Sequence, residues 1–149
     1  MLFLHADTRL GPNWRACADT WRADPEASGQ AAVFRFALDD AAWQARVVER
    51  MVALRIRLIG LAFGDQGLLI HRQFLLSLGL FRPIAMLEDV DAAWLIGKRR
   101  LHVLPVAALT SARRWRKDGW LRRSLRNLLC VVLFRLGVPV KIIAAVYEA

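Results

Sequence analysis

A strand-like segment followed closely by a long helical segment constrains the fold of this chain more than any other feature. Side chains alternate across Ala31–Leu38, with Phe34 and Phe36 on the same side, which is typical of a strand. Apolar residues then recur at helical spacing over residues 43–58, which predicts a helix. Because a strand and a helix joined by a short loop bury their apolar faces against each other, this pair favours a layered α/β domain.

Shorter patterns extend the same alternation through the rest of the chain. We expect further strands at residues 2–5, 68–71 and 101–104, and further helices at residues 12–22, 72–78 and 90–96. A long helical region is expected from residue 110 onward, broken near Gly137 and Pro139 and ending near Tyr147, with loops at residues 6–10, at residues 60–67 and from Pro83. The 149 residues show no internal repeat or linker. They therefore predict one α/β domain, with an α/β part at 1–110 and C-terminal helices at 111–149.

Composition favours one compartment and argues against a membrane-spanning helix. With 56% hydrophobic residues the chain can bury a substantial core. Cys17 and Cys130 lie far apart without metal-ligand spacing, which favours reduced thiols in a cytoplasmic protein. The most apolar stretch, residues 128–146, is interrupted by Arg135 and Lys141, so it suits helices that lie on a surface better than a helix that crosses a bilayer.

The positive charge of the chain is local. The formal net charge is +9, and residues 98–126 account for all of it, because that segment holds ten Lys and Arg against a single Asp. Such a patch favours an anionic partner, which the charge alone leaves open between a diphosphate, acidic lipid headgroups and nucleic acid. For Arg122, Arg123 and Arg126 we expect a solvated helix face or contact with lipid headgroups, which would hold a cytoplasmic protein peripherally at the inner membrane face.

Two acidic motifs have the placement that metal and proton chemistry need. Asp7 follows directly after an expected buried strand, where a carboxylate is held firmly enough to bind a divalent ion together with substrate phosphates. It can equally cap its turn through Thr8. Glu88 and Asp89 begin an expected helix, where acids stabilise the helix dipole, and a carboxylate there can also serve as a general base.

Two further motifs suggest ligand contacts. In Gly64-Asp65-Gln66-Gly67, the glycines allow a close approach of the backbone to a ligand that Asp65 and Gln66 would contact, although a tight turn explains the glycines equally well. In residues 111–115, Ser-Ala-Arg-Arg-Trp, an arginine fork matches diphosphate oxygens and Trp115 can form a wall of the site. Arg113 and Arg114 point in different directions on a helix, so at most one reaches the phosphates.

These motifs, in this order after the opening Leu-Phe-Leu-His-Ala-Asp-Thr, resemble family 2 glycosyltransferases with a GT-A fold. Within that family the chain is most similar to the bacterial rSAM/selenodomain-associated transferases, also described as arsenosugar-biosynthesis glycosyltransferases. Gly64 to Gly67 corresponds to the most specific string of that group. The chain departs from the family's Met-Glu-Asp-Val pattern, because Leu87 stands between Met86 and Glu88.

The resemblance implies transfer of a sugar from a nucleotide-diphosphate donor to an acceptor hydroxyl, with inversion. It implies Mg²⁺ or Mn²⁺ on Asp7, with His5 in place of the first acid of an Asp-any-Asp motif. Asp89 would be the base, with Glu88 orienting it or the acceptor. Asp65 and Gln66 would lie near sugar or acceptor, and Arg113 or Arg114, with Trp115, would contact the donor.

The resemblance covers only the second part of the family's domain, so a partial GT-A fold is expected. The first part, which holds the base and ribose in the crevice of a parallel sheet, would precede Met1. Residues 2–5 would then form an exposed apolar edge strand, which favours self-association or a partner chain carrying the missing part. One alternative is that the chain is an inactive remnant. Another is a basic module that binds acidic membrane or nucleic acid through residues 98–126. The lack of a nucleic-acid-binding motif argues against nucleic acid as its partner.

Overall fold

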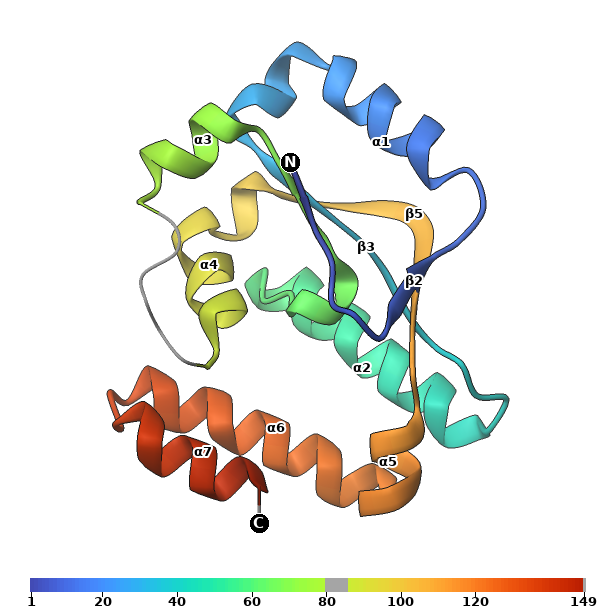
Figure 1. The fold of residues 1–149 in the computed structure, drawn as a ribbon, viewed down its shortest axis with the longest axis vertical. Helices are drawn as coiled ribbons and strands as arrows, with labels where there is room; N and C mark the ends of the chain where they lie inside the picture. The colour runs from blue at the N-terminus through green and yellow to red at the C-terminus, as the bar shows by residue number, and fades with distance from the viewer. Residues whose placement is uncertain (80–85, 149) are drawn as a thin grey trace.

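The centre of the molecule is a five-stranded mixed sheet that curls into a half-barrel (Figure 1). The computed structural model describes residues 1–79 and 86–148. Across the sheet the strand order is β1-β4-β3-β5-β2, and only β3 and β5 are parallel. The strands are β1 (Leu2–Phe3), β2 (Thr8–Leu10), β3 (Ala31–Leu38), β4 (Leu68–Ile70) and β5 (Leu101–Thr110).

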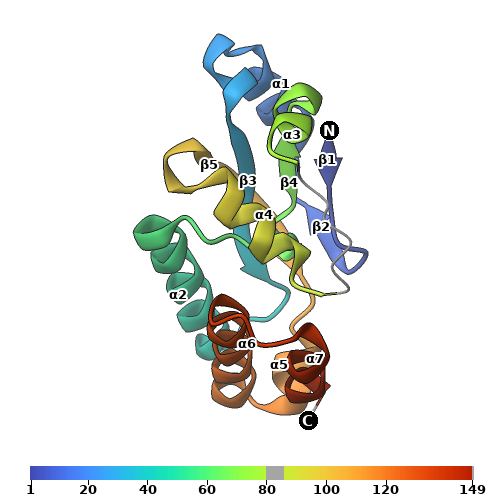
Figure 2. The same ribbon diagram turned by 90° about the vertical axis from the view of Figure 1, so that its left-hand side faces the viewer.

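Helices cover the sheet and form a further layer at one end of it (Figures 1 and 2). Helix α1 packs on β5, α2 packs on β3, and α6 contacts α2, α5 and α7. The α-helices are α1 (Trp14–Ala23), α2 (Trp43–Ile59), α3 (Arg72–Ser77), α4 (Glu88–Ile96), α5 (Arg113–Asp118), α6 (Trp120–Arg135) and α7 (Val140–Glu148). Three short 3-10 helices are η1 (Pro25–Gly29), η2 (Gly64–Gln66) and η3 (Lys98–Arg100).

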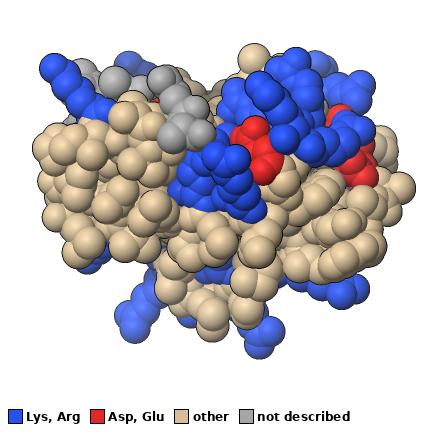
Figure 3. All heavy atoms as spheres, turned by 90° about the horizontal axis from the view of Figure 1, so that it is seen from below, with Lys and Arg blue, Asp and Glu red and all other residues tan. Residues whose placement is uncertain are grey.

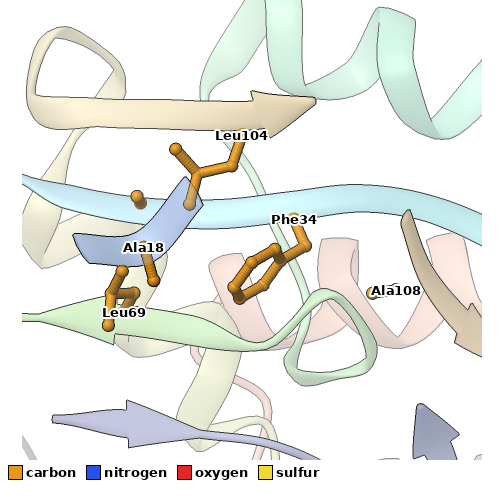
Figure 4. Close-up of a cluster of buried hydrophobic side chains, with 6 residues drawn as sticks. Ala18, Phe34, Leu69, Leu104 and Ala108 are labelled. Atoms are coloured by element: carbon orange, nitrogen blue, oxygen red, sulfur yellow. The ribbon is translucent and has the colours of Figure 1, made fainter. Parts of the chain in front are cut away.

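The central strand β3 is buried along almost its whole length, because elements cover both of its faces. Seven of its eight residues are buried and only Arg35 is exposed. Phe34 has no exposed surface and packs with Ala18 of α1 and with Leu69 and Leu104 of the neighbouring strands (Figure 4). This explains why the sequence of β3 is nearly all apolar, as expected of a strand that is covered on both faces.

The strongest sequence predictions are confirmed. The strand at Ala31–Leu38 has the expected bounds, and the helix expected over residues 43–58 is α2. The expected elements at 12–22, 68–71, 72–78 and 90–96 are found within two residues at each end. The loop expected from Pro83 lies outside the described residues.

Three predictions about elements are wrong, and long-range pairing explains the first two. Residues 6–10, expected to be a loop, contain β2, which pairs with the far end of β5. Strand β5 was expected to end at Leu104 but continues to Thr110, because its second half pairs with β2 on one side and β3 on the other. The helix expected from residue 110 begins at Arg113 and breaks at Gly119, whose φ of 86° is incompatible with a continuing helix.

The sheet is mixed, not the parallel sheet that the resemblance implies, and β1 lies at one edge, as expected for the first residues. Leu2 and Phe3 are half-buried and Leu4 is exposed. None of the helices in the described part of the chain is long and apolar enough to cross a membrane.

Candidate active site

Residues that the sequence analysis singled out in four separate motifs meet around one pocket of about 280 Å³. The pocket is bounded by the turn after β1, by η2, by the start of α4, by the junction of β5 with α5, and by α6 and α7. Seven of the nine predicted site residues line it: His5, Asp7, Asp65, Glu88, Asp89, Arg114 and Trp115.

Asp89 connects two walls of the pocket through its carboxylate. Its Oδ2 accepts a hydrogen bond from the backbone N–H of Gly64 at 2.7 Å, and its Oδ1 accepts one from Val90 at 2.7 Å. The second bond ties the carboxylate to the first turn of α4, where a negative charge is favourable. The first holds η2 against this helix, so Asp89 has a structural role whatever its chemistry.

The Asp65 carboxylate is buried, lacks a hydrogen-bond partner on one oxygen within the described part of the chain and has a raised pKa. The oxygen without a partner is Oδ1. Burial raises the pKa of Asp65 to about 6; the nearby Arg55 guanidinium opposes this rise, and the Asp89 carboxylate adds to it. Its backbone carbonyl is fixed by the Thr110 hydroxyl, which donates to it at 3.1 Å. The backbone is therefore anchored while one carboxylate oxygen has no hydrogen-bond partner among the described residues.

The glycine at position 64 is explained by His5. A Cβ built on Gly64 would lie 2.2 Å from His5 Nε2, which is far inside contact distance. The imidazole therefore rests directly on the η2 backbone, and any larger residue would displace it. At this glycine the sequence motif serves the close approach of a side chain of the protein itself.

The opposite wall is basic and rests on α7. Arg114 Nη1 donates to the Tyr147 hydroxyl at 3.0 Å, and Arg123 Nη2 donates to the same hydroxyl. Arg123 is only 5% exposed, and its Nη1 also donates to Asp118 Oδ2 at 3.2 Å. The pocket thus has a mainly carboxylate side and a guanidinium side.

The expectation that Arg123 and Arg126 form a solvated or lipid-facing surface is wrong. Arg126 is half-buried; its Nη1 lies 3.6 Å from Asp118 Oδ2 and donates to the Tyr147 carbonyl at 3.2 Å. The cause is α7, which folds back along α6 and covers this side of it. Other Lys and Arg side chains remain at the surface of the end formed by α5, α6 and α7, with acidic side chains among them (Figure 3).

Two predicted site residues lie away from the pocket. Gln66 is fully buried and its Nε2 donates to the Phe34 carbonyl at 3.1 Å, so this amide braces η2 against β3. Arg113 is exposed and does not line the pocket, whereas its neighbour Arg114 does. Of the two arginines, therefore, Arg114 is the one that borders the pocket.

Arg55 is a residue that the sequence reasoning missed. Its guanidinium carbon lies 3.6 Å from the centre of the Phe63 ring, and its Nε donates to the Leu61 carbonyl at 2.8 Å. Burial lowers the pKa of Arg55 to about 10, against the opposing effect of Asp65 and Asp89. A signal was present, because Arg55 follows Val48 and Val52 at helical spacing on the inner face of α2.

The carboxylate side of the pocket can contribute only part of a metal site. The described residues contain no group of three or more His, Cys, Asp or Glu side chains arranged to hold an ion. Asp7 is exposed and lines the pocket, so its carboxylate suits a hard cation whose remaining ligands are water or substrate oxygens, and the exposed His5 lines the same pocket as a candidate nitrogen ligand. The residues present therefore fit Mg²⁺ or Mn²⁺ in company with a phosphate-bearing ligand.

No protein-family model, no curated protein and no solved structure matches this chain.

Proposed function

We propose that this chain belongs to a glycosyltransferase that moves a sugar from a nucleotide-diphosphate donor to an acceptor hydroxyl. The observation that carries the proposal is the pocket with acidic groups on one side and guanidinium groups on the other. A nucleotide-sugar needs this combination, since its diphosphate requires cationic partners and its sugar hydroxyls require acceptors. The finer assignment, a partial GT-A fold, is part of the same proposal.

Arg114 and Arg123 are the proposed diphosphate ligands. Both guanidinium groups border the pocket, and their shared contact with Tyr147 restrains them before a ligand arrives. Preorganised cations stabilise charge at the leaving group without reorganising during the reaction. Asp7 and His5 are the residues that would hold Mg²⁺ or Mn²⁺, and a bound cation would supply further neutralisation of the diphosphate charge.

The proton from the acceptor needs a carboxylate base, and two carboxylates are candidates. Asp89, the base implied by the family resemblance, already accepts two backbone hydrogen bonds. The free Oδ1 of Asp65 and its pKa of about 6 support Asp65 as the base, because a base titrating near neutral pH works best at neutral pH. Asp89 then keeps η2 in position, and Glu88 remains at the rim for the acceptor.

The proposed step is a single displacement. The acceptor oxygen forms a bond to the anomeric carbon while the bond from that carbon to the diphosphate oxygen breaks. The diphosphate leaves with the bonding electron pair, held by Arg114 and Arg123, and the hydroxyl proton passes to Asp65. No oxidant or reductant is required.

The test is donor binding measured by calorimetry, with UDP-glucose and GDP-mannose as probes and Mn²⁺ present. Arg114→Met should weaken binding by about tenfold or more, the usual result of losing a charged hydrogen bond. Arg113→Met is the matched control, one residue away, exposed and outside the pocket, and should bind as the unaltered chain does. Equal losses in the two variants, or binding by single-stranded nucleic acid that both variants weaken, would favour the basic-module alternative.

A further inference from the structure

A second, larger depression lies beside the pocket, between α2 and α6. It has a volume of about 990 Å³ and is lined mainly by apolar side chains. Several of these are strongly exposed, notably Trp43 at 72%, Met51 at 61% and Leu121 at 73%. We refer to this depression as the apolar groove. Its volume is at the upper end of what small-molecule sites in proteins enclose.

The apolar groove and the pocket share a wall. Phe63, Asp65, Trp115, Asn127 and Val131 line both. The groove therefore runs from an exposed apolar region at one end to the candidate active site at the other.

Buried polar atoms without partners gather at this shared wall. Among the described residues, Asp65 Oδ1, Asn127 Oδ1 and Trp115 Nε1 are buried there with no hydrogen-bond partner, and Arg55 Nη2 lines the groove in the same state. A folded protein normally satisfies such atoms. Their presence points to a ligand group that both donates and accepts hydrogen bonds, since two of these atoms are acceptors and two are donors.

A hydroxyl group at the end of a hydrocarbon chain satisfies both parts of this site. The hydrocarbon chain of the ligand would cover the apolar walls. Its hydroxyl would donate to a carboxylate or amide oxygen while it accepts from an N–H group. A second copy of the protein could cover the exposed apolar rim, but a protein surface laid across that rim does not reach the polar atoms at the shared wall.

We propose that the acceptor of this site is a lipid alcohol, with its hydrocarbon chain in the apolar groove and its hydroxyl at the wall shared with the pocket. The assignment of the hydroxyl as an acceptor rests on the proposed glycosyltransferase function. The binding of a lipid alcohol does not, because it depends only on the apolar groove and on the polar atoms at its inner end.

The experiment uses the tryptophans of the protein as reporters. Four of the six tryptophans line the apolar groove: Trp43, Trp94, Trp115 and Trp120. A terminally brominated dodecanol quenches tryptophan fluorescence on contact and can be titrated as a dispersed monomer. We expect saturable quenching, and saturation should require about tenfold more ligand for Leu128→Asp, which loses one apolar contact in the groove.

The controls separate the contribution of the ligand's hydrocarbon chain from that of its hydroxyl group. Leu128 is 57% exposed, and Leu76 on α3 is 61% exposed but outside the apolar groove, so Leu76→Asp should be quenched as the unaltered chain is. Bromododecane, which lacks the hydroxyl, should bind more weakly than the brominated dodecanol. Equal binding of these two ligands would overturn the assignment of the hydroxyl to the shared wall.

Other outcomes are also decisive. Quenching that does not saturate, or that Leu128→Asp leaves unchanged, overturns the proposal. So does a dimer, detected by light scattering, that Leu128→Asp dissociates and that excludes the alcohol. A chain that binds UDP-glucose but no alcohol refutes the lipid acceptor alone, whereas one that binds the alcohol but no nucleotide-sugar keeps the lipid site and overturns the assignment of a donor site to this chain.

Discussion

Replacing Asp65 by Asn should make the protein more stable at neutral pH. The folded chain raises the pKa of this carboxyl from 3.8 to about 6, mainly because it is buried. A rise of roughly two units corresponds to about 3 kcal/mol of differential interaction between the two protonation states. Asn has nearly the same shape and carries no charge, so Asp65→Asn avoids the cost of burying the ionised group.

The pH dependence gives the sign of this effect. Between about pH 4 and about pH 6 the folded chain keeps a proton that the unfolded chain has released. The contribution of Asp65 to the free energy of unfolding therefore falls as the pH rises through this window and stays at its lower value above it. Asp65→Asn should gain up to about 3 kcal/mol above pH 6 and little below about pH 4.

Urea unfolding, followed by far-UV circular dichroism at a series of pH values, measures this difference. The matched control is Asp19→Asn, because Asp19 is exposed and its pair with Arg22 at 3.1 Å is a surface contact. That control should change the free energy of unfolding by less than about 1 kcal/mol at any pH. A variant at position 65 that is less stable than the unaltered chain at pH 7, or a difference that does not depend on pH, would refute the reasoning.

Three further predictions concern contacts around the pocket. Gly64→Ala should displace the His5 imidazole yet change the free energy of unfolding by less than about 1 kcal/mol, because the clashing atoms belong to an exposed side chain. Unchanged NMR signals of the His5 ring would contradict this. Arg123→Met should lower the free energy of unfolding, measured in urea, by about 3 kcal/mol, because it leaves Asp118 without its closest cation. A loss below about 0.5 kcal/mol would show that the pair is effectively solvated. Thr110→Val should cost about 1–3 kcal/mol, because it removes hydrogen bonds to Thr8 and to the Asp65 carbonyl; unchanged thermal unfolding would show that these bonds add nothing.

The parts of the fold that were predicted from sequence are those with strong local patterns. Strand β3 and helix α2 have clear apolar periodicity, so their bounds were expected almost as they are found. Strand β2 was missed because three residues carry no periodic signal, and it exists only through pairing with β5. The extension of β5 past Pro105 was missed for a different reason, because a proline usually marks the end of a strand.

The residues that meet in the candidate site were expected from the sequence where side-chain chemistry alone singles them out. Carboxylates beside glycines and an arginine beside a tryptophan are recognisable in any chain, and most of them do meet in space. The burial of Arg123 and its contact with Tyr147 were missed because they depend on how α7 folds against α6. The role of Gln66 was misread because an amide that braces two backbone segments has the same sequence signature as one that binds a ligand.

The hydrogen bond between the Thr8 and Thr110 hydroxyls, 2.7 Å long, joins residues 102 positions apart in the chain. Closing a loop of that size costs more entropy than any local contact, so such pairings form late in folding. Thr110 in turn donates to the Asp65 carbonyl at 3.1 Å, so the candidate active site completes its assembly only when β2 has paired with the end of β5. Ligand binding during refolding should therefore recover no earlier than the slowest structural phase, and a partly folded intermediate should contain helices and the central strands but no working site.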